Sequence, residues 1–141
     1  MADLNFGELR FDNESKENVQ RVLSRVYAAA AGPEVLEYEQ KWGELFGYKY
    51  NTAVYSGTGA DTIACKLLYD FADAERGDEI IAPALAFMAV GTSILDAGFK
   101  PVFVDVERHT LNINPRAIEE KITPRTRAIM AVHTMGKPCE M

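Results

Sequence analysis

The chain has 141 residues, 48% hydrophobic and 26% charged, which is the composition of a globular protein with a sizeable core. Its net charge of −6, without a block of lysine and arginine, argues against a nucleic-acid partner. No stretch has the length of a membrane span, no leader-like start is present, and the two cysteines form no disulfide framework, so we expect a cytoplasmic protein.

Two helices are predicted in residues 1–50, which we expect to form an N-terminal helical segment. Asn13 or Ser15 is suited to cap the first helix, whose apolar stripe is Val19, Val22, Leu23 and Val26. The second helix is predicted to begin at Pro33 and to end at Gly47. Its buried side is expected to consist of Val35, Leu36, Trp42, Leu45 and Phe46.

A strand and a helix are predicted on either side of a glycine-rich turn. Residues 51–55 are β-branched and aromatic, which is typical of a buried strand. A helix should follow the turn and continue to about Ala74. Its inward residues are predicted from their spacing to be Ile63, Ala64, Leu67, Leu68 and Phe71.

The turn itself contains Ser56, Gly57, Thr58 and Gly59. The first N–H groups of a helix lack partners within the helix and lie at the positive end of its dipole, which favours a phosphate. Glycine lets a ligand approach the backbone, and hydroxyl groups add hydrogen bonds. An ordinary strand-to-helix loop remains the alternative. A dinucleotide fingerprint is disfavoured, because Thr62 occupies the place of its third glycine or alanine.

Three further strands are predicted, at residues 79–82, 100–105 and 128–132. Residues 84–97 are read mostly as a helix, and a short helix with Ala117, Ile118 and Ile122 inward follows Pro115. The apolar runs do not alternate and are separated by helices, which indicates parallel strands covered on both faces. We therefore predict the α/β class, with residues 51–141 forming part of a cofactor-binding domain.

Ligands of parallel sheets bind at the carboxyl ends of the strands, where this chain has Phe87, Asp105 and His133 in addition to the glycine turn. Phe87 could stack on a flat ring or belong to the core, and from the residues alone the core is favoured. Asp105 could bind a substrate or cap the following turn, and capping is favoured. His133 could act as an acid or base or hydrogen-bond a loop, and the loop contact is favoured. No histidine and cysteine spacing predicts a metal site.

Several segments together resemble the N-terminal part of the DegT/StrS family of sugar aminotransferases. The resemblance depends on their order along the chain: 32–35, 56–58, 77–83, 97–105, 112–115 and 122–129. The family consists of pyridoxal 5′-phosphate (PLP) enzymes of the aspartate-aminotransferase fold. The resemblance implies that this chain is an incomplete portion of the large domain of such an enzyme.

The resemblance also implies roles for residues. Ser56, Gly57, Thr58 and Gly59 would bind the 5′-phosphate of PLP, and Phe87 would stack on its pyridine ring, which reverses the preference for the core. The partners implied are an amino-acid donor, usually glutamate, and a nucleotide-linked keto sugar, and the family works as a homodimer.

The chain departs from the family pattern at three positions. Asp61 places a carboxylate near the phosphate turn, which weakens the site unless it faces away, and Ala84 and Ala86 replace hydroxyl residues. The family's cofactor-bonding lysine and the aspartate that pairs with the pyridine nitrogen correspond to positions beyond Met141, so no catalytic residue is assigned and we expect no transamination by this chain alone. A dehydratase of the same family, or a non-catalytic phosphate-binding or self-associating module, remains open.

Overall fold

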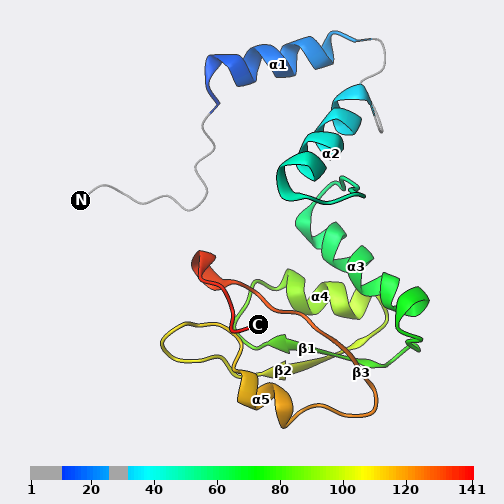
Figure 1. The fold of residues 1–141 in the computed structure, drawn as a ribbon, viewed down its shortest axis with the longest axis vertical. Helices are drawn as coiled ribbons and strands as arrows, with labels where there is room; N and C mark the ends of the chain where they lie inside the picture. Colours follow the sequence, from blue (N-terminus) through cyan, green and yellow to red (C-terminus); the bar gives the residue numbers. More distant parts are fainter. Residues whose placement is uncertain (1–10, 26–31) are drawn as a thin grey trace. The chain divides into compact units, whose positions relative to one another are not determined.

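The computed structural model describes residues 11–25 and 32–141. The chain divides into two compact units, Met1–Ala53 and Val54–Met141. The first unit contains two helices and the second contains the sheet (Figure 1). Within the described ranges, no helix is both long enough and apolar enough to cross a bilayer.

The helices of the first unit are α1 (Asn13–Leu23) and α2 (Pro33–Phe46). Asp12, and neither Asn13 nor Ser15, caps α1, because its carboxylate accepts a hydrogen bond from the Ser15 N–H at 2.7 Å. As predicted, α2 begins at Pro33 and ends at Gly47, whose φ of 77° places it in the left-handed region that glycine tolerates.

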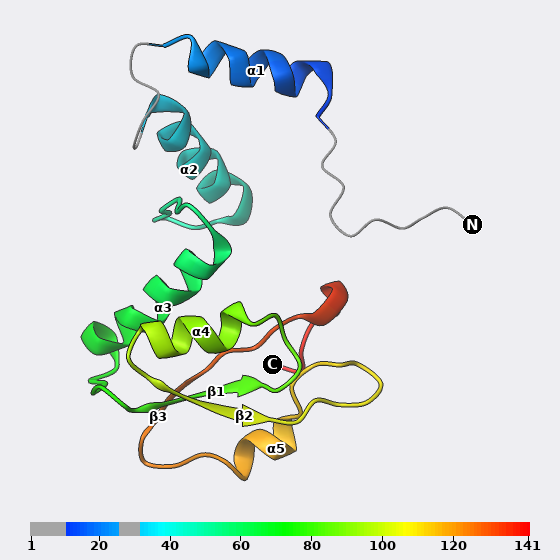
Figure 2. The same cartoon turned by 180° about the vertical axis from the view of Figure 1, so that it is seen from behind.

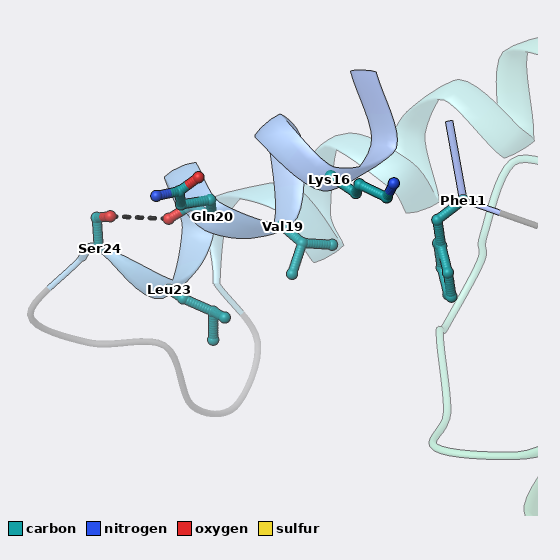
Figure 3. A pocket seen from close by; sticks show the side chains of 6 residues that line it. All are labelled: Phe11, Lys16, Val19, Gln20, Leu23 and Ser24. Carbon is teal, nitrogen blue, oxygen red and sulfur yellow. Dashed lines mark hydrogen bonds between the residues drawn. The ribbon is translucent and has the colours of Figure 1, made fainter. Parts of the chain in front are cut away.

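The apolar faces predicted on these helices are present, but the burial expected for α2 is wrong. On α1, Val19 and Leu23 are exposed and point to the same side as Phe11 (Figure 3), while Val26 lies outside the described residues. On α2, Gly43 is the buried residue, and four residues of the predicted buried side are exposed: Leu36, Trp42, Leu45 and Phe46. Helical spacing identifies an apolar face but not the element that covers it.

The second unit is a three-stranded parallel sheet with helices on both faces, which confirms the predicted fold class. The strands are β1 (Glu79–Pro83), β2 (Lys100–Val104) and β3 (Thr126–Ile129), in the order β2-β1-β3. The helices α3 (Gly57–Phe71) and α4 (Ala89–Asp96) lie over one face and α5 (Pro115–Glu119) over the other (Figures 1 and 2). A short 3₁₀ turn, η1 (Thr134–Gly136), follows β3.

The central strand β1 explains why the apolar runs do not alternate. All five residues of β1 are buried, and successive side chains enter different cores. Ile80 and Ala82 pack with residues of α3 and α4, whereas Ile81 packs with Val104 and Ile113 on the side of α5. Because both faces are covered by helices, both sets of side chains must be apolar.

Several predicted boundaries differ from the structure. Residues 51–55 form no strand in the described chain, since β-propensity cannot supply the neighbouring strand that a ladder requires. In place of one helix over 84–97, a loop at 84–88 precedes α4. The last strand covers 126–129 and not 128–132, although the Met130 N–H still donates to the Ile81 carbonyl at 2.8 Å.

The inward face of α3 also differs from the prediction. Leu68 packs against the core as expected, but it does so beside Cys65 and Tyr69. The other residues of the predicted inward set are exposed: Ile63, Ala64, Leu67 and Phe71. On α5, Ala117 and Ile118 face inward as predicted, while Ile122 lies beyond the helix and is exposed.

Charged side chains form a cluster of ion pairs at the amino end of the sheet. The carboxylate of Asp78, which is only 2% exposed, accepts hydrogen bonds from the Glu75 N–H at 3.0 Å, from Arg125 Nε at 3.1 Å and from Arg127 Nε at 2.6 Å. The Glu75 N–H and the two guanidinium groups lower the pKa of Asp78 from 3.8 to about 2. This cluster links the residue before β1 to Arg125, which precedes β3, and to Arg127 within β3.

Candidate functional site

The glycine turn forms the amino terminus of α3, where Ser56 is the N-cap residue. Ser56 Oγ accepts a hydrogen bond from the Gly59 N–H at 3.0 Å, and the Ser56 carbonyl accepts one from the Ala60 N–H at 3.0 Å. Within the described part of the chain, the N–H groups of Gly57 and Thr58 donate to no acceptor. The helix therefore offers two backbone donors at the positive end of its dipole.

The two glycines of the turn have different surroundings. A Cβ atom added to Gly57 would meet no atom within 4 Å, so the space beside this residue is open to a ligand. A Cβ atom added to Gly59 would lie 2.9 Å from ring carbons of Tyr55. Gly59 is buried, and its lack of a side chain serves the close approach of the Tyr55 ring.

Asp61 lies on the side of α3 that faces the sheet. It lines a hollow of about 250 Å³ together with Cys65, Leu68 and residues of β1 and β3. Burial raises the pKa of the Cys65 thiol, and the neighbouring Asp61 carboxylate raises it further. Asp61 is thus grouped with residues that pack toward the sheet, one turn before Cys65 on the same side of α3.

Phe87 lies in the loop between β1 and α4, and its side chain is 77% exposed. It lines a hollow of about 330 Å³ with Met88, Leu95 and Phe103 among other residues. The interpretation of Phe87 as a core residue of a helix is therefore wrong, because α4 begins two residues later. An exposed flat ring next to the carboxyl end of β1 is available for stacking.

The other residues at the carboxyl ends of the strands bond to nearby backbone. Asp105 Oδ1 accepts a hydrogen bond from the Val106 N–H at 2.8 Å, a contact with the next residue that does not reach the turn at 108–110. His133 Nδ1 accepts one from the Cys139 N–H at 3.0 Å, which confirms the loop contact. Across residues 11–25 and 32–141, no three histidine, cysteine or acidic side chains gather as a metal site would require.

Asn112 was not singled out from the sequence except as part of a family segment. Its side chain is buried and bonds to the backbone of the loop that follows β3. Two asparagines flank Ile113, and only the structure shows that Asn114 caps α5 while Asn112 fastens a distant loop. The signal for Asn112 in the sequence is the presence of two asparagines just before Pro115.

The first turn of α3 and the loop carrying Phe87 lie at the same end of the sheet. α3 ends near the start of β1, to which the segment 72–78 connects it, so its first turn lies toward the carboxyl ends of the strands (Figure 1). This is the end at which parallel sheets bind ligands. The residues fit a ligand that combines a phosphate with a flat ring.

A model of the DegT/DnrJ/EryC1/StrS aminotransferase family matches residues 10–141. The chain belongs to this family. The resemblance drawn from the ordered segments is thereby confirmed, and the match covers both compact units of the chain.

Sequence and structure comparisons agree with this assignment. The chain is 37% identical over 139 residues to the dTDP-3-amino-3,6-dideoxy-alpha-D-galactopyranose transaminase of Aneurinibacillus thermoaerophilus, an alignment covering 99% of this chain and 37% of that protein. Helicobacter pylori PseC, an aminotransferase involved in the biosynthesis of pseudoaminic acid, matches with a TM-score of 0.81 and 29% identity, over 96% of this chain and 36% of PseC.

A second solved structure is a GDP-4-keto-6-deoxymannose-3-dehydratase with a trapped PLP-glutamate geminal diamine. It matches with a TM-score of 0.81 and 30% identity, over 92% of this chain and 34% of the dehydratase. The chain spans about a third of the length of the curated relatives it matches.

Proposed function

We propose that this chain is part of a PLP-dependent aminotransferase that acts on nucleotide-linked keto sugars. One observation carries the proposal: an exposed phenylalanine ring and the capped amino terminus of α3 lie toward the carboxyl end of the sheet, and the N–H groups of Gly57 and Thr58 have no acceptor among the described residues. In a chain of this family, these are the features that a phosphorylated pyridine requires. When bound, PLP would supply an electron sink for the carbon that carries the amino group being transferred.

Each residue of the site has its own role in binding PLP. Gly57 and Thr58 donate their N–H groups to the phosphate, and the open space at Gly57 admits it. The Ser56 hydroxyl fixes the first turn by accepting from the Gly59 N–H, and its own proton remains free to donate. Gly59 keeps the turn compact against Tyr55, and Phe87 supports the flat face of the ring.

The names of the relatives support the proposed partners. One relative is a transaminase named for a dTDP-linked sugar, and the dehydratase structure contains a trapped PLP-glutamate geminal diamine. These names favour a nucleotide-linked keto sugar and glutamate as the partners of the whole protein. Residues 1–50 then serve as an N-terminal helical segment, and residues 51–141 as part of the cofactor-binding domain. The uncovered apolar faces of α1 and α2 favour association, and we propose a cytoplasmic homodimer.

A dehydratase of the same family is the second candidate function. It is supported by the TM-score of 0.81 with a dehydratase, the same value that the chain gives with the aminotransferase PseC. The dehydratase structure contains a PLP-glutamate geminal diamine, so the same phosphate turn and Phe87 would serve either reaction. Incubation of the full-length protein with glutamate and a keto sugar distinguishes the two, because only the aminotransferase places nitrogen on the sugar.

Binding of PLP and of pyridoxal to the chain tests the proposed cofactor site. The two compounds share the ring, but pyridoxal lacks the phosphate, so we expect PLP to bind more tightly by at least tenfold. The Phe87→Ala variant should weaken the binding of both compounds by a similar factor, because it removes the stacking surface. Equal affinity for PLP and pyridoxal would overturn the proposal.

A further inference from the structure

The loop after β3 is fastened by one buried side chain. Asn112 is 3% exposed, and its Oδ1 accepts a hydrogen bond from the Thr134 N–H at 2.9 Å. Its Nδ2 donates to the carbonyls of Lys137 and Pro138, each at 3.0 Å. The amide thus bonds to both sides of the loop and holds η1 between them.

Unfavourable backbone conformations in the same place indicate that this loop shape is imposed. Leu111 has a φ of 60° and Met135 a φ of 53°, and both carry side chains that disfavour the left-handed region. The hydroxyl of Thr134 donates to the Leu111 carbonyl at 3.2 Å. Conformations of this kind persist where surrounding contacts enforce them, and they are concentrated at ligand sites.

The fastened loop fixes the tautomer of His133. Nδ1 of this residue accepts a hydrogen bond from the Cys139 N–H, and the Cys139 thiol donates to the Val132 carbonyl at 3.2 Å. Because a backbone N–H only donates, Nδ1 holds a lone pair and the neutral ring carries its proton on Nε2. The side chain is exposed, and in the described ranges Nε2 has no acceptor.

His133 follows β3, which is the parallel neighbour of β1, so it lies at the same carboxyl edge as Phe87. We propose that Nε2–H of His133 donates a hydrogen bond to an acceptor oxygen of the phosphorylated ring compound bound at this edge, and that Asn112 is the positioning residue for the imidazole. This inference rests on the proposed function, since it adds a contact to the same site.

The chain has two histidines, so imidazole NMR spectra give a signal for His133 and an internal reference from His109, which is exposed. We expect PLP to shift the Nε2 resonance of His133 together with the amide resonances of Gly57 and Thr58, and to leave His109 unchanged. Shifts of the two amides without a shift of His133 would overturn this inference alone. Absence of the amide shifts would overturn the proposed function and this contact with it.

Variants of Asn112 test its positioning role. Asn112→Asp places an oxygen against the Lys137 and Pro138 carbonyls, and we expect roughly tenfold weaker PLP binding, as for the loss of one hydrogen bond. Asn114→Asp is the matched control, because aspartate caps a helix as well as asparagine does. It should change neither PLP binding nor the spectrum of His133.

A double-mutant cycle separates positioning from general stability. His133→Phe should weaken PLP binding by about the same factor as Asn112→Asp, and the double variant should bind no more weakly than His133→Phe. The imidazole of Asn112→Asp should also lose the single Nε2–H tautomer. If the effects of the two substitutions on PLP affinity multiply, Asn112 does not act through His133 and the proposal is wrong.

Discussion

Replacement of Gly57 by aspartate gives opposite expectations for the helix and for the ligand. The position has room for a side chain, since a Cβ atom there would meet nothing within 4 Å. A carboxylate in the first turn of α3 lies near the positive end of the helix dipole and stabilises the helix by about 0.3–1 kcal/mol. The same carboxylate repels a phosphate bound to the Gly57 and Thr58 N–H groups.

The repulsion is large enough to measure. Two unit charges about 4 Å apart repel by about 1 kcal/mol in water and by about 4 kcal/mol at the effective dielectric constant near a protein surface. Binding of PLP should therefore weaken by a factor between roughly 5 and roughly 1,000. Asparagine at the same position has nearly the same size without the charge, so Gly57→Asn is the matched control.

The assay combines a PLP titration with urea unfolding of the three proteins. We expect Gly57→Asp to bind PLP at least fivefold more weakly than Gly57→Asn while unfolding at the same or a higher urea concentration. An equal PLP affinity of the two variants would refute phosphate binding at this turn. Lower stability of the aspartate variant would refute the dipole reasoning.

Three further predictions concern stability and reactivity. The pKa of Asp78, about 2, lies below the ordinary 3.8, so the contribution of this carboxylate to stability is complete above about pH 4 and is lost as the pH falls toward 2. The urea midpoint of Asp78→Asn should be lower than that of the unchanged chain near neutral pH and should lack this pH dependence. Gly98→Ala should lower the free energy of unfolding by about 1–2 kcal/mol, because Gly98 has a φ of 91° and an added Cβ would lie 2.9 Å from the Tyr69 hydroxyl. Gly136→Ala, at a φ of 80° with open space around it, should lower the free energy of unfolding by less. Equal losses for the two variants would contradict the clash with Tyr69. Cys65, buried and with a raised pKa, should resist a thiol reagent in the native chain and react in urea, so rapid native labelling would contradict its burial.

The parts of the fold predicted correctly from sequence are those that local pattern determines. Residues 80–82 form an apolar run that does not alternate, and β1 is buried on both faces as that pattern predicts. Pro33 and Gly47 mark the ends of α2 through their own backbone preferences. The ends of α2 depend on neighbouring residues only, and the burial of β1 can be predicted from its own residues although distant helices provide it.

The parts that were predicted wrongly depend on distant residues. Residues 51–55 have strand propensity but no partner strand in the described chain, and the aromatic face of α2 has no described element covering it. The start of α4 was misplaced because the Ala84 N–H donates to the Val104 carbonyl, a contact across 20 residues of chain that helix propensity ignores.

The candidate site shows the same division. The glycine turn is readable from sequence, because Ser, Gly and Thr before an apolar helical pattern indicate a capped amino terminus. The exposure of Phe87 cannot be predicted from the sequence, since it depends on where α4 begins. The hydrogen bonds of Asn112 cannot be predicted either, since they depend on backbone atoms of residues 134–138.

A crystal structure of the chain grown with PLP tests the cofactor site most directly. We predict that phosphate oxygens lie within hydrogen-bond distance of the Gly57 and Thr58 N–H groups and that the pyridine ring lies flat against Phe87. A phosphate bound away from the first turn of α3, or a ring that does not contact Phe87, would contradict the proposed cofactor site.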